Sequence, residues 1–209
     1  MGLYKTEQED FWAGDFGNEY IGRNEGEDIV AGNTALFASI LQKTRGIESV
    51  IEFGANIGLN LCALKWLLPK ATFAGVEINA KAATQLRKLG FVDVFHQSIL
   101  DYPAQVRHDL VLTKTVLIHI GPEYLPTVYE KLYASSARYI CIAEYYSQDP
   151  VEITYRGHTA KLFKRDFAGD MLKRFPDLSL AGYGFVYQND PVFPLDDITW
   201  FLLEKKLPV

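Results

Sequence analysis

A glycine-containing loop between an apolar strand and an apolar helix is the feature that most constrains the fold of this chain. Residues 50–60 read Val-Ile-Glu-Phe-Gly-Ala-Asn-Ile-Gly-Leu-Asn, and the next apolar run, residues 71–76, is followed by Glu77. In an open parallel α/β sheet, glycines after the first strand let the backbone approach a ligand. A carboxylate at the end of the next strand accepts hydrogen bonds from ribose hydroxyls. The sequence therefore predicts a site for an adenosine-bearing cofactor.

The spacing within this loop separates two classes of cofactor. The fingerprint of nicotinamide-binding proteins is G-x-G-x-x-G, which places a pyrophosphate at a helix N-terminus. Here the loop reads G-x-N-x-G, with Asn56 in the position of the second glycine, between Gly54 and Gly58. The third glycine is missing. The loop therefore suits a ligand with a ribose and no phosphate, and a nicotinamide oxidoreductase is disfavoured.

Composition limits the remaining classes of protein. The chain has 209 residues, of which 48% are hydrophobic, and this fits one domain over residues 1–209 with a full core. No apolar run reaches the roughly 18 residues of a membrane span, and the first ten residues lack the apolar core of a signal peptide. A net charge of −5 argues against a nucleic-acid partner.

The cysteines and histidines indicate no metal site, because the two cysteines and four histidines lack metal-ligand spacing. Cys62 and Cys141 lie in apolar surroundings and are expected to be buried free thiols. Free thiols suit a reducing, cytoplasmic location. No feature of the sequence predicts an oligomeric state.

Strand and helix patterns alternate along the chain, which is typical of a parallel sheet with helices on both faces. The expected strands are residues 49–53, 72–77, 92–96, 109–113 and 138–144. The expected helices are residues 59–68, 80–89 and 123–135. An earlier helix is expected to be capped by Asn33 or Thr34 and to run to about Thr44.

The C-terminus breaks this alternation. Residues 178–188 and 198–204 read as two strands joined by a turn-rich loop without a helix. Two strands joined in this way pair antiparallel. We therefore expect an α/β fold whose parallel sheet ends in a C-terminal antiparallel hairpin.

This combination of features resembles the class I S-adenosylmethionine-dependent methyltransferases. Their first motif is an acidic or polar residue in a strand followed by G-x-x-x-G, and their second is an acidic residue that ends strand two. The matching residues are Glu52, Gly54, Asn56, Gly58 and Glu77. The resemblance implies a seven-stranded Rossmann-like sheet, S-adenosyl-L-methionine as cofactor, and cofactor contacts from these residues together with Ala55 and Ile78.

The resemblance also implies cofactor contacts after strands three and four. Residues 96–101 follow the third strand, where the family binds adenine, and Ser98 and Ile99 would contact the ring. Residues 109–120 resemble the fourth motif, which leads to the methionine end of the cofactor. The polar residues of that segment are Thr113, Lys114 and His119.

The N-terminal segment, residues 1–32, is rich in aromatic residues, glycines and acids. We expect a helical lid that folds over the ligand, because aromatic side chains exclude water from a site. Trp12 and Tyr20 would cover the cofactor, and Arg23 would pair with its methionine carboxylate. The alternative is that the aromatic residues only dock the segment on the core.

Longer strings are similar to the family of pseudaminic acid biosynthesis-associated methylases. They are residues 11–24, 144–146, 150–158, 162–171 and 196–201. This resemblance covers nearly the whole chain. It implies a methyl acceptor from surface-glycan biosynthesis, such as a sugar acid or a nucleotide-activated sugar.

Residues 147–175 are expected to form an insertion on the acceptor side. From residue 156 to residue 174 the chain carries six basic and two acidic residues, a local charge of +4 within a chain of −5. A basic patch at the carboxyl edge of a parallel sheet, where ligands bind, indicates a small anionic acceptor. Lys173 and Arg174 fit a solvated helix end. The residues expected to bind the acceptor, in or near a loop, are Arg156, Lys161, Lys164 and Arg165.

The need for a catalytic base depends on the acceptor atom. A carboxylate needs no base, whereas a hydroxyl must lose its proton. His119 is the best candidate base, because imidazole titrates near neutrality and the residue follows the fourth motif. A cofactor contact or a structural role is the alternative for His119. Glu144, Tyr145 and Tyr146, at the end of the fifth strand, are further candidates.

Two other functions remain open. The same fold could methylate an amino acid, or a peptide carboxylate or amine. The chain could also be a non-catalytic cofactor-binding module. The intact glycine loop and Glu77 count against the second of these, since a module that had lost its activity would not need them.

Overall fold

The computed structural model describes residues 4–23 and 26–206 of the chain. Residues 1–3, 24–25 and 207–209 lie outside the described part. The two ends of the predicted domain, residues 1–209, and two pieces of the predicted lid, residues 1–32, therefore lie outside it. So does Asn24, the last residue of the string 11–24.

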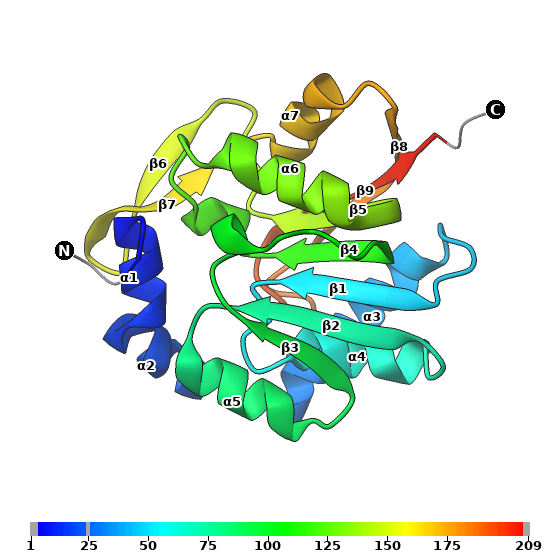
Figure 1. The fold of residues 1–209 in the computed structure, drawn as a ribbon, viewed down its shortest axis with the longest axis horizontal. Coiled ribbons are helices and arrows are strands. Elements are labelled where there is room, and N and C mark those ends of the chain that lie inside the picture. Colours follow the sequence, from blue (N-terminus) through cyan, green and yellow to red (C-terminus); the bar gives the residue numbers. More distant parts are fainter. Residues whose placement is uncertain (1–3, 24–25, 207–209) are drawn as a thin grey trace.

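A seven-stranded mixed sheet forms the centre of the molecule (Figure 1). Its strands are β1 (Ser49–Phe53), β2 (Thr72–Glu77), β3 (Val92–His96), β4 (His108–Lys114), β5 (Ser136–Glu144), β8 (Leu178–Val186) and β9 (Ile198–Lys205). The strand order is β3-β2-β1-β4-β5-β9-β8. Strands β1 to β5 run parallel, and β9 is antiparallel to both β5 and β8. The predicted α/β fold with a C-terminal antiparallel hairpin is confirmed.

The strand order places a topological switch point at β1. Phe53, the last residue of β1, lies opposite Val76 of β2 on one side and Thr113 of β4 on the other. The carboxyl ends of these three strands therefore meet at one edge of the sheet, on the left in Figure 1. Open α/β sheets bind ligands in the crevice at such a point.

Helices cover both faces of the sheet (Figure 1). On one face lie α3 (Glu27–Leu41), α4 (Leu59–Leu67) and α5 (Ala80–Lys88), and on the other lie α6 (Leu125–Ser135) and α7 (Phe167–Arg174). Val50 and Leu112 join the core under the first group, whereas their neighbours Ile51 and Val111 join the core under the second. Because both faces are buried, these strands are nearly continuous apolar runs, which makes them visible in the sequence.

Helix α3 differs from the prediction. It begins at Glu27 and ends at Leu41, so Asn33 and Thr34 lie inside the helix and do not cap it. Glu27 fills the first turn together with a second acid, where the helix dipole favours negative charge. The hydroxyl of Thr34 donates to the carbonyl oxygen of Val30 at 2.7 Å, within the helix.

Two N-terminal helices and a small second sheet lie beside the carboxyl edge. The helices are α1 (Glu7–Ala13) and α2 (Asp15–Arg23), and the sheet is a hairpin of β6 (Val151–Tyr155) and β7 (His158–Lys164). The hairpin lies next to α1 in Figure 1. Gln8 of α1 donates from Nε2 to the carbonyl oxygen of Ala160 in β7 at 3.1 Å.

This hairpin corrects the expectation of a loop around the basic residues. Arg156 lies in the hairpin turn, where it and Gly157 both adopt positive φ, whereas Lys161 and Lys164 lie in β7.

Two short helices also follow strands: η1 (Ile99–Asp101) after β3 and η2 (Leu117–His119) after β4.

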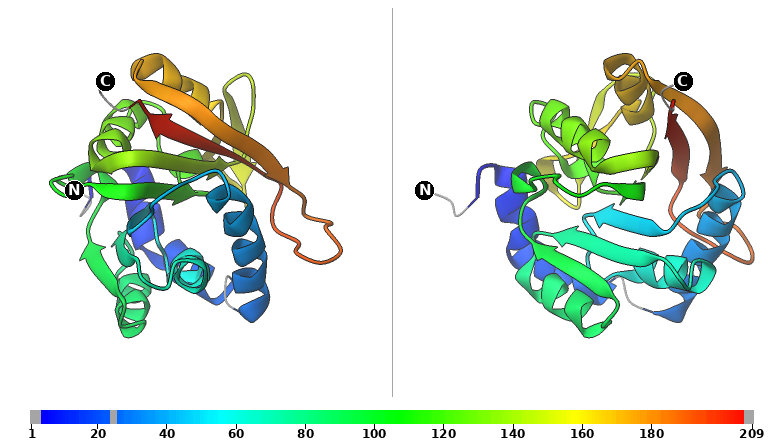
Figure 2. Two further views of the ribbon diagram at one scale, coloured as in Figure 1. Left: turned by 90° about the vertical axis from the view of Figure 1, so that its right-hand side faces the viewer. Right: turned by 45° about the vertical axis from the view of Figure 1, so that its right-hand side comes forward.

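Strand β8 is one of the two edge strands of the seven-stranded sheet, and β3 is the other. In both views of Figure 2, β8 lies at the outer edge of the sheet, and the left view shows the loop that joins it to β9 projecting from the body of the molecule. Among the residues that the structure describes, no helix is long and apolar enough to cross a membrane.

We expect the stability of the fold to be most sensitive to substitutions in the buried central strands. Leu112 of β4 is fully buried, so Leu112→Ala should lower the free energy of unfolding in urea by about 2–5 kcal/mol, the cost of lost contacts and of the cavity. Trp66→Ala is the control, because Trp66 is 80% exposed, and it should change stability by no more than about 0.5 kcal/mol. Equal effects of the two substitutions would contradict this account of the core.

Candidate functional site

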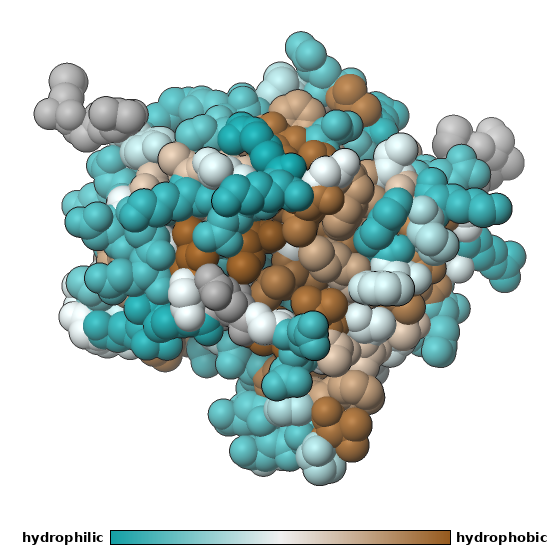
Figure 3. All heavy atoms as spheres, turned by 90° about the horizontal axis from the view of Figure 1, so that it is seen from below, coloured by the Kyte–Doolittle hydropathy of each residue, from teal (hydrophilic) through white to brown (hydrophobic). Residues whose placement is uncertain are grey.

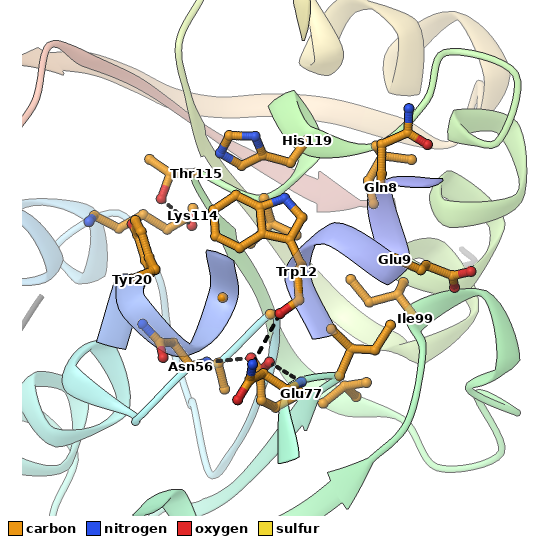
Figure 4. A pocket seen from close by; sticks show the side chains of 18 of the residues that line it. Gln8, Glu9, Trp12, Tyr20, Asn56, Glu77, Ile99, Lys114, Thr115 and His119 are labelled. Atoms are coloured by element: carbon orange, nitrogen blue, oxygen red, sulfur yellow. Dashed lines mark hydrogen bonds between the residues drawn. The ribbon is translucent and has the colours of Figure 1, made fainter. Parts of the chain in front are cut away.

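A pocket opens at the carboxyl ends of β1, β2 and β4, beneath α1 and α2 (Figure 4). The residues that line it come from α1 and α2, from α3 and α4, and from the glycine loop, the end of β2, η1 and the segment after β4. Of the residues predicted to bind the cofactor, those that line the pocket are Trp12, Tyr20, Gly54, Ala55, Asn56, Glu77, Ile78, Ser98, Ile99 and Lys114. The sheet topology therefore gathers most of the predicted set in one place.

The loop after β1 needs its glycine for steric reasons. Gly54 has a φ of +76°, and a Cβ built there would lie 2.4 Å from Cγ2 of Val116. Any larger residue would displace Val116 or strain the turn. Asn56 also has a positive φ, of 48°, and asparagine adopts this left-handed conformation more readily than most residues. Gly58 caps α4 behind the pocket and does not line it.

The carboxylate of Glu77 lies at the floor of the pocket and connects two chain segments (Figure 4). Its Oε2 accepts a hydrogen bond from the amide of Asn56 at 2.7 Å, and its Oε1 accepts one from the amide of Asn79 at 2.7 Å. Burial raises the pKa of Glu77, while the backbone donors act in the opposite direction by favouring the charged form. A carboxylate oxygen can accept more than one bond, so ribose hydroxyls could still bind here.

The first acidic residue, Glu52, lies below the pocket and does not line it. It is fully buried and accepts a bond at 2.5 Å from Nδ2 of Asn60, which does line the pocket. Burial raises the pKa of Glu52 to about 8, and the charge of Lys114 opposes that rise. Burial lowers the pKa of Lys114, and the negative charge of Glu52 opposes this shift.

Several buried polar atoms at the pocket lack a partner in the described part of the chain. They are Nε1 of Trp12, Oδ1 of Asn33 and Oδ1 of Asn60, and all three residues line the pocket. Buried polar groups are normally hydrogen-bonded. One donor and two acceptors therefore lie at the pocket, and they fit a polar ligand that carries both hydrogen-bond acceptors and donors.

The loop after β3 is tied to the N-terminal helix α1. The hydroxyl of Ser98 donates to the Glu9 carboxylate and accepts a bond from the amide of Leu100 at 3.0 Å. Glu9 also closes the capping box of α1 with Thr6. Ile99, next to Ser98, presents an apolar side chain to the pocket (Figure 4).

Helices α1 and α2 contribute aromatic rings to the lining of the pocket. The indole of Trp12 lies 4.5 Å from the His119 ring and 5.1 Å from the Tyr20 ring, measured between centroids. Arg23 does not line the pocket; its guanidinium lies over the rings of Phe16, at 5.1 Å, and Tyr20, at 5.9 Å. The pairing of Arg23 with a cofactor carboxylate stays a prediction.

His119 ends η2 and forms part of the pocket wall (Figure 4). Its Nδ1 lies 2.6 Å from the carbonyl oxygen of Lys161 in β7, so Nδ1 carries the ring proton in the neutral form. Burial lowers the pKa of His119 to about 4. The ring is therefore neutral near pH 7, with its basic lone pair on Nε2.

The other candidate catalytic residues do not line the described pocket. Glu144 is buried and accepts hydrogen bonds from the amides of Val116, at 2.9 Å, and Leu117, at 3.0 Å. Its carboxylate thus fixes the start of η2. The hydroxyl of Tyr145 donates to Asp196 at 2.8 Å.

Two further predicted residues also lie outside the pocket lining. Tyr146 is 44% exposed, and its ring packs against Phe201, 5.9 Å away between centroids. Thr113 is buried at the end of β4, where its hydroxyl lies 3.5 Å from Oε1 of Glu144. Neither residue is placed to contact a ligand in the described pocket.

The four basic residues predicted to bind the acceptor are all described, and none of them lines the pocket. Lys161 pairs with Glu7 at 3.4 Å, and Arg165 pairs with Asp170 at 3.6 Å. The remaining two lie over tyrosine rings: Lys164 is 5.2 Å from the ring of Tyr145, and Arg156 is 5.9 Å from that of Tyr155.

The pocket also contains residues that the sequence analysis missed. Asn79 donates from Nδ2 to the carbonyl oxygen of Trp12 at 3.1 Å and caps α5 with its Oδ1. Its position, two residues after Glu77 and just before a helix, is the signal that could have identified it. Asn33 and Asn60 lie inside helices and carry no comparable signal. No cluster of potential metal ligands occurs among the residues that the structure describes.

No protein-family model matches the sequence, and no curated protein matches it. The fold is similar to that of several solved methyltransferases. Magnesium protoporphyrin IX methyltransferase from Synechocystis PCC 6803, solved with SAH (S-adenosylhomocysteine), aligns with a TM-score of 0.68 and 15% identity over 94% of this chain and 97% of its own.

Two further structures agree with this similarity. The plantazolicin methyltransferase BpumL, in complex with SAH, has a TM-score of 0.66 and 15% identity over 96% of this chain and 94% of its own. A SAM-dependent methyltransferase from Archaeoglobus fulgidus has a TM-score of 0.65 and 14% identity over 91% of this chain and 100% of its own. The protein therefore has the fold of the class I S-adenosylmethionine-dependent methyltransferases.

Proposed function

We propose that the protein is an S-adenosylmethionine-dependent methyltransferase that acts on a small acceptor. The observation that carries the proposal is the position of Glu77. Glu77 lines the pocket beside a glycine loop that lacks the second and third glycines of a pyrophosphate site. The fold that the chain shares with methyltransferases solved with SAH supports this reading.

The pocket offers a suitable group for each part of this cofactor. Glu77 would accept bonds from the ribose hydroxyls, and Ile99 would pack on the adenine. The unpaired Oδ1 atoms of Asn33 and Asn60 would accept bonds from the amino group of the methionine end. Lys114 lines the same pocket and would offset the charge of the carboxylate.

The cofactor supplies a methyl group bound to a positively charged sulfur, and the protein has to align an acceptor with it and exclude water. The rings of Trp12, Tyr20 and His119 would perform the second task, because they cover the pocket from the lid and from η2. Tyr155 extends this cover, with its ring 5.1 Å from that of His119. In this proposal α1 and α2 form the lid predicted within residues 1–32, and their aromatic residues also dock on the hairpin.

His119 is proposed as the general base for an acceptor that must lose a proton. The carbonyl of Lys161 holds the proton on Nδ1, so the Nε2 lone pair is the basic site. A neutral imidazole at pH 7 could accept a proton from a hydroxyl as its oxygen attacks the methyl group. A carboxylate acceptor would not use this group.

The acceptor itself is proposed to be a small anion, such as a sugar acid or a nucleotide-activated sugar. Support comes from the charge of +4 between residues 156 and 174 in a chain of −5, and from the resemblance to pseudaminic acid biosynthesis-associated methylases. Because Arg156 and Lys164 lie on the hairpin and not in the pocket lining, they would bind the part of the acceptor that remains outside. An amino acid or a peptide group is the alternative acceptor, and a non-catalytic cofactor-binding module is the alternative to an enzyme.

Cofactor binding can be tested by calorimetric titration. S-adenosylmethionine and S-adenosylhomocysteine should bind, and Glu77→Ala should weaken binding by about 1–3 kcal/mol, the cost of lost bonds to the ribose. Trp66→Ala, which is remote from the pocket, should bind as the wild type does. Equal or tighter binding of NADH would overturn the proposed cofactor, and unchanged affinity of Glu77→Ala would remove Glu77 from the site.

The role of His119 can be tested once labelled cofactor and a panel of sugar acids, amino acids and nucleotide conjugates have identified the acceptor by mass spectrometry. His119→Ala should lower kcat by about 10²–10⁴-fold, more than any loss of cofactor affinity that follows from its lost contact with Trp12. Since burial lowers the pKa of His119 to about 4, the wild-type kcat should fall as the pH drops through that value and stay constant above it. Full activity of His119→Ala would rule out His119 as the general base.

The basic residues of the β6–β7 hairpin, Arg156 and Lys164, allow a separate test of whether the acceptor is an anion. Arg156→Ala and Lys164→Ala should raise the KM for the acceptor and leave cofactor affinity unchanged, because both side chains lie outside the cofactor pocket. Lys173→Ala is the matched control, since Lys173 is exposed on α7, and it should change neither constant. A loss of cofactor affinity with unchanged KM would count against the hairpin as the acceptor site.

A further inference from the structure

The free edge of the sheet carries a concentration of exposed apolar side chains. Strand β8 and the loop after it expose Leu180, Tyr183, Phe185, Tyr187, Val192 and Phe193, each by between 45% and 68%. The three aromatic residues of this set at positions 183, 185 and 187 alternate with less exposed neighbours, so they share one face of the strand. In Figure 3 the loop projects at the bottom of the view, with apolar side chains exposed on it.

The same aromatic surface continues inward across the sheet. The ring of Phe201 in β9 stacks on Tyr183, with centroids 6.4 Å apart, and packs against Tyr146, which follows β5. An exposed apolar surface that extends over neighbouring strands is more than a few scattered side chains, and such surfaces mark interaction sites.

The backbone of β8 is also available for pairing. Within the described residues, β8 pairs with β9 on one side and has no strand on the other. Residues 178–189 contain no charged residue, and the first proline after the start of β8 is Pro191. Edge strands that stay unpaired are usually protected by charges, prolines or a covering element. Strand β8 contains neither charged residues nor prolines.

The charges lie at the two ends of this neutral strand and have opposite signs. Three basic residues, Lys173, Arg174 and Lys206, lie around the start of β8 with one acid, Asp177, whose carbonyl oxygen accepts a bond from the amide of Lys206 at 2.8 Å. The loop after β8 contains three acids, Asp190, Asp196 and Asp197, and no base. The strand therefore runs from a largely basic end to an acidic end.

We propose that two copies of this chain associate through β8, antiparallel about a two-fold axis, so that the sheet continues from one copy into the other. Antiparallel pairing places the basic end of each strand against the acidic end of the other, whereas parallel pairing would bring like charges together. With the axis near Gly184, Tyr183 lies opposite the partner's Phe185, and such aromatic cross-strand pairs stabilise a sheet. A two-fold contact of this kind uses the same surface on both copies.

The area available suits a stable dimer. With about 200 Å² for a large aromatic side chain, the exposed apolar side chains of β8 and its loop offer on the order of 600 Å² per copy. The backbone of the paired strands adds to this. A standard stable interface buries about 800 Å² per partner. The proposal does not depend on the chemistry of the pocket.

Sedimentation velocity over a range of micromolar concentrations tests the proposal. The wild-type chain should sediment as a dimer of twice the 23.6 kDa chain mass. The double variant Tyr183→Lys/Phe185→Lys should be monomeric, with dimerisation weakened by about a hundredfold or more, because two buried aromatic anchors are replaced by charges. Its melting temperature and its affinity for S-adenosylhomocysteine should match those of the wild type at concentrations where both are monomeric.

A matched control and a second readout make the result decisive. Trp66→Lys adds a charge at another exposed aromatic residue and should remain dimeric. If the double variant does not fold, hydrogen exchange of the wild type replaces it: amides of β8 should be protected at high concentration and exchange faster on dilution. A wild-type monomer throughout, a dimer that the double variant leaves intact, or β8 exchange independent of concentration would each overturn the proposal.

Discussion

The buried carboxylate of Glu77 is the interaction on which the arrangement of the pocket depends. It ends β2 and accepts backbone hydrogen bonds from Asn56 in the glycine loop and from Asn79 at the start of α5. Asn79 in turn donates to the carbonyl oxygen of Trp12, which lies in the lid. One acid therefore connects the second strand, the loop after the first strand and the N-terminal helices. Its backbone donors favour the charged form of the carboxylate and so oppose the effect of its burial, which raises its pKa.

Much of the fold could be predicted because its central strands are buried on both faces. Apolar runs such as residues 49–53 and 72–77 become visible for that reason, and the missing helix between residues 188 and 198 predicts the antiparallel hairpin. The start of α3 could not be predicted in the same way. Its N-cap is Gly26, which makes no side-chain hydrogen bond, so the sequence carries no capping signal there and Asn33 looked like a better start.

The pocket was predictable where a residue ends a strand, as Glu77 ends β2 and Lys114 ends β4, because parallel strands bring those ends together. The hairpin β6–β7 was not predictable, since Val151 and Ile153 are both more than a third exposed and its strands show no burial alternation. Its lysine at position 161 pairs with Glu7, 154 residues away in the chain. Such contacts arise only from the three-dimensional arrangement. The hydrogen bond between His119 and the carbonyl oxygen of Lys161 is another example.

The tethering of the lid has a kinetic consequence. Trp12 is bound by Asn79 on one side and packs on His119 on the other, while Gln8 and Glu7 reach the hairpin. Ligand exchange beneath α1 requires several of these contacts to break together. For the proposed methyl transfer, we therefore expect the departure of the spent cofactor, and not the chemical step, to limit turnover, as in enzymes whose sites close beneath a flap.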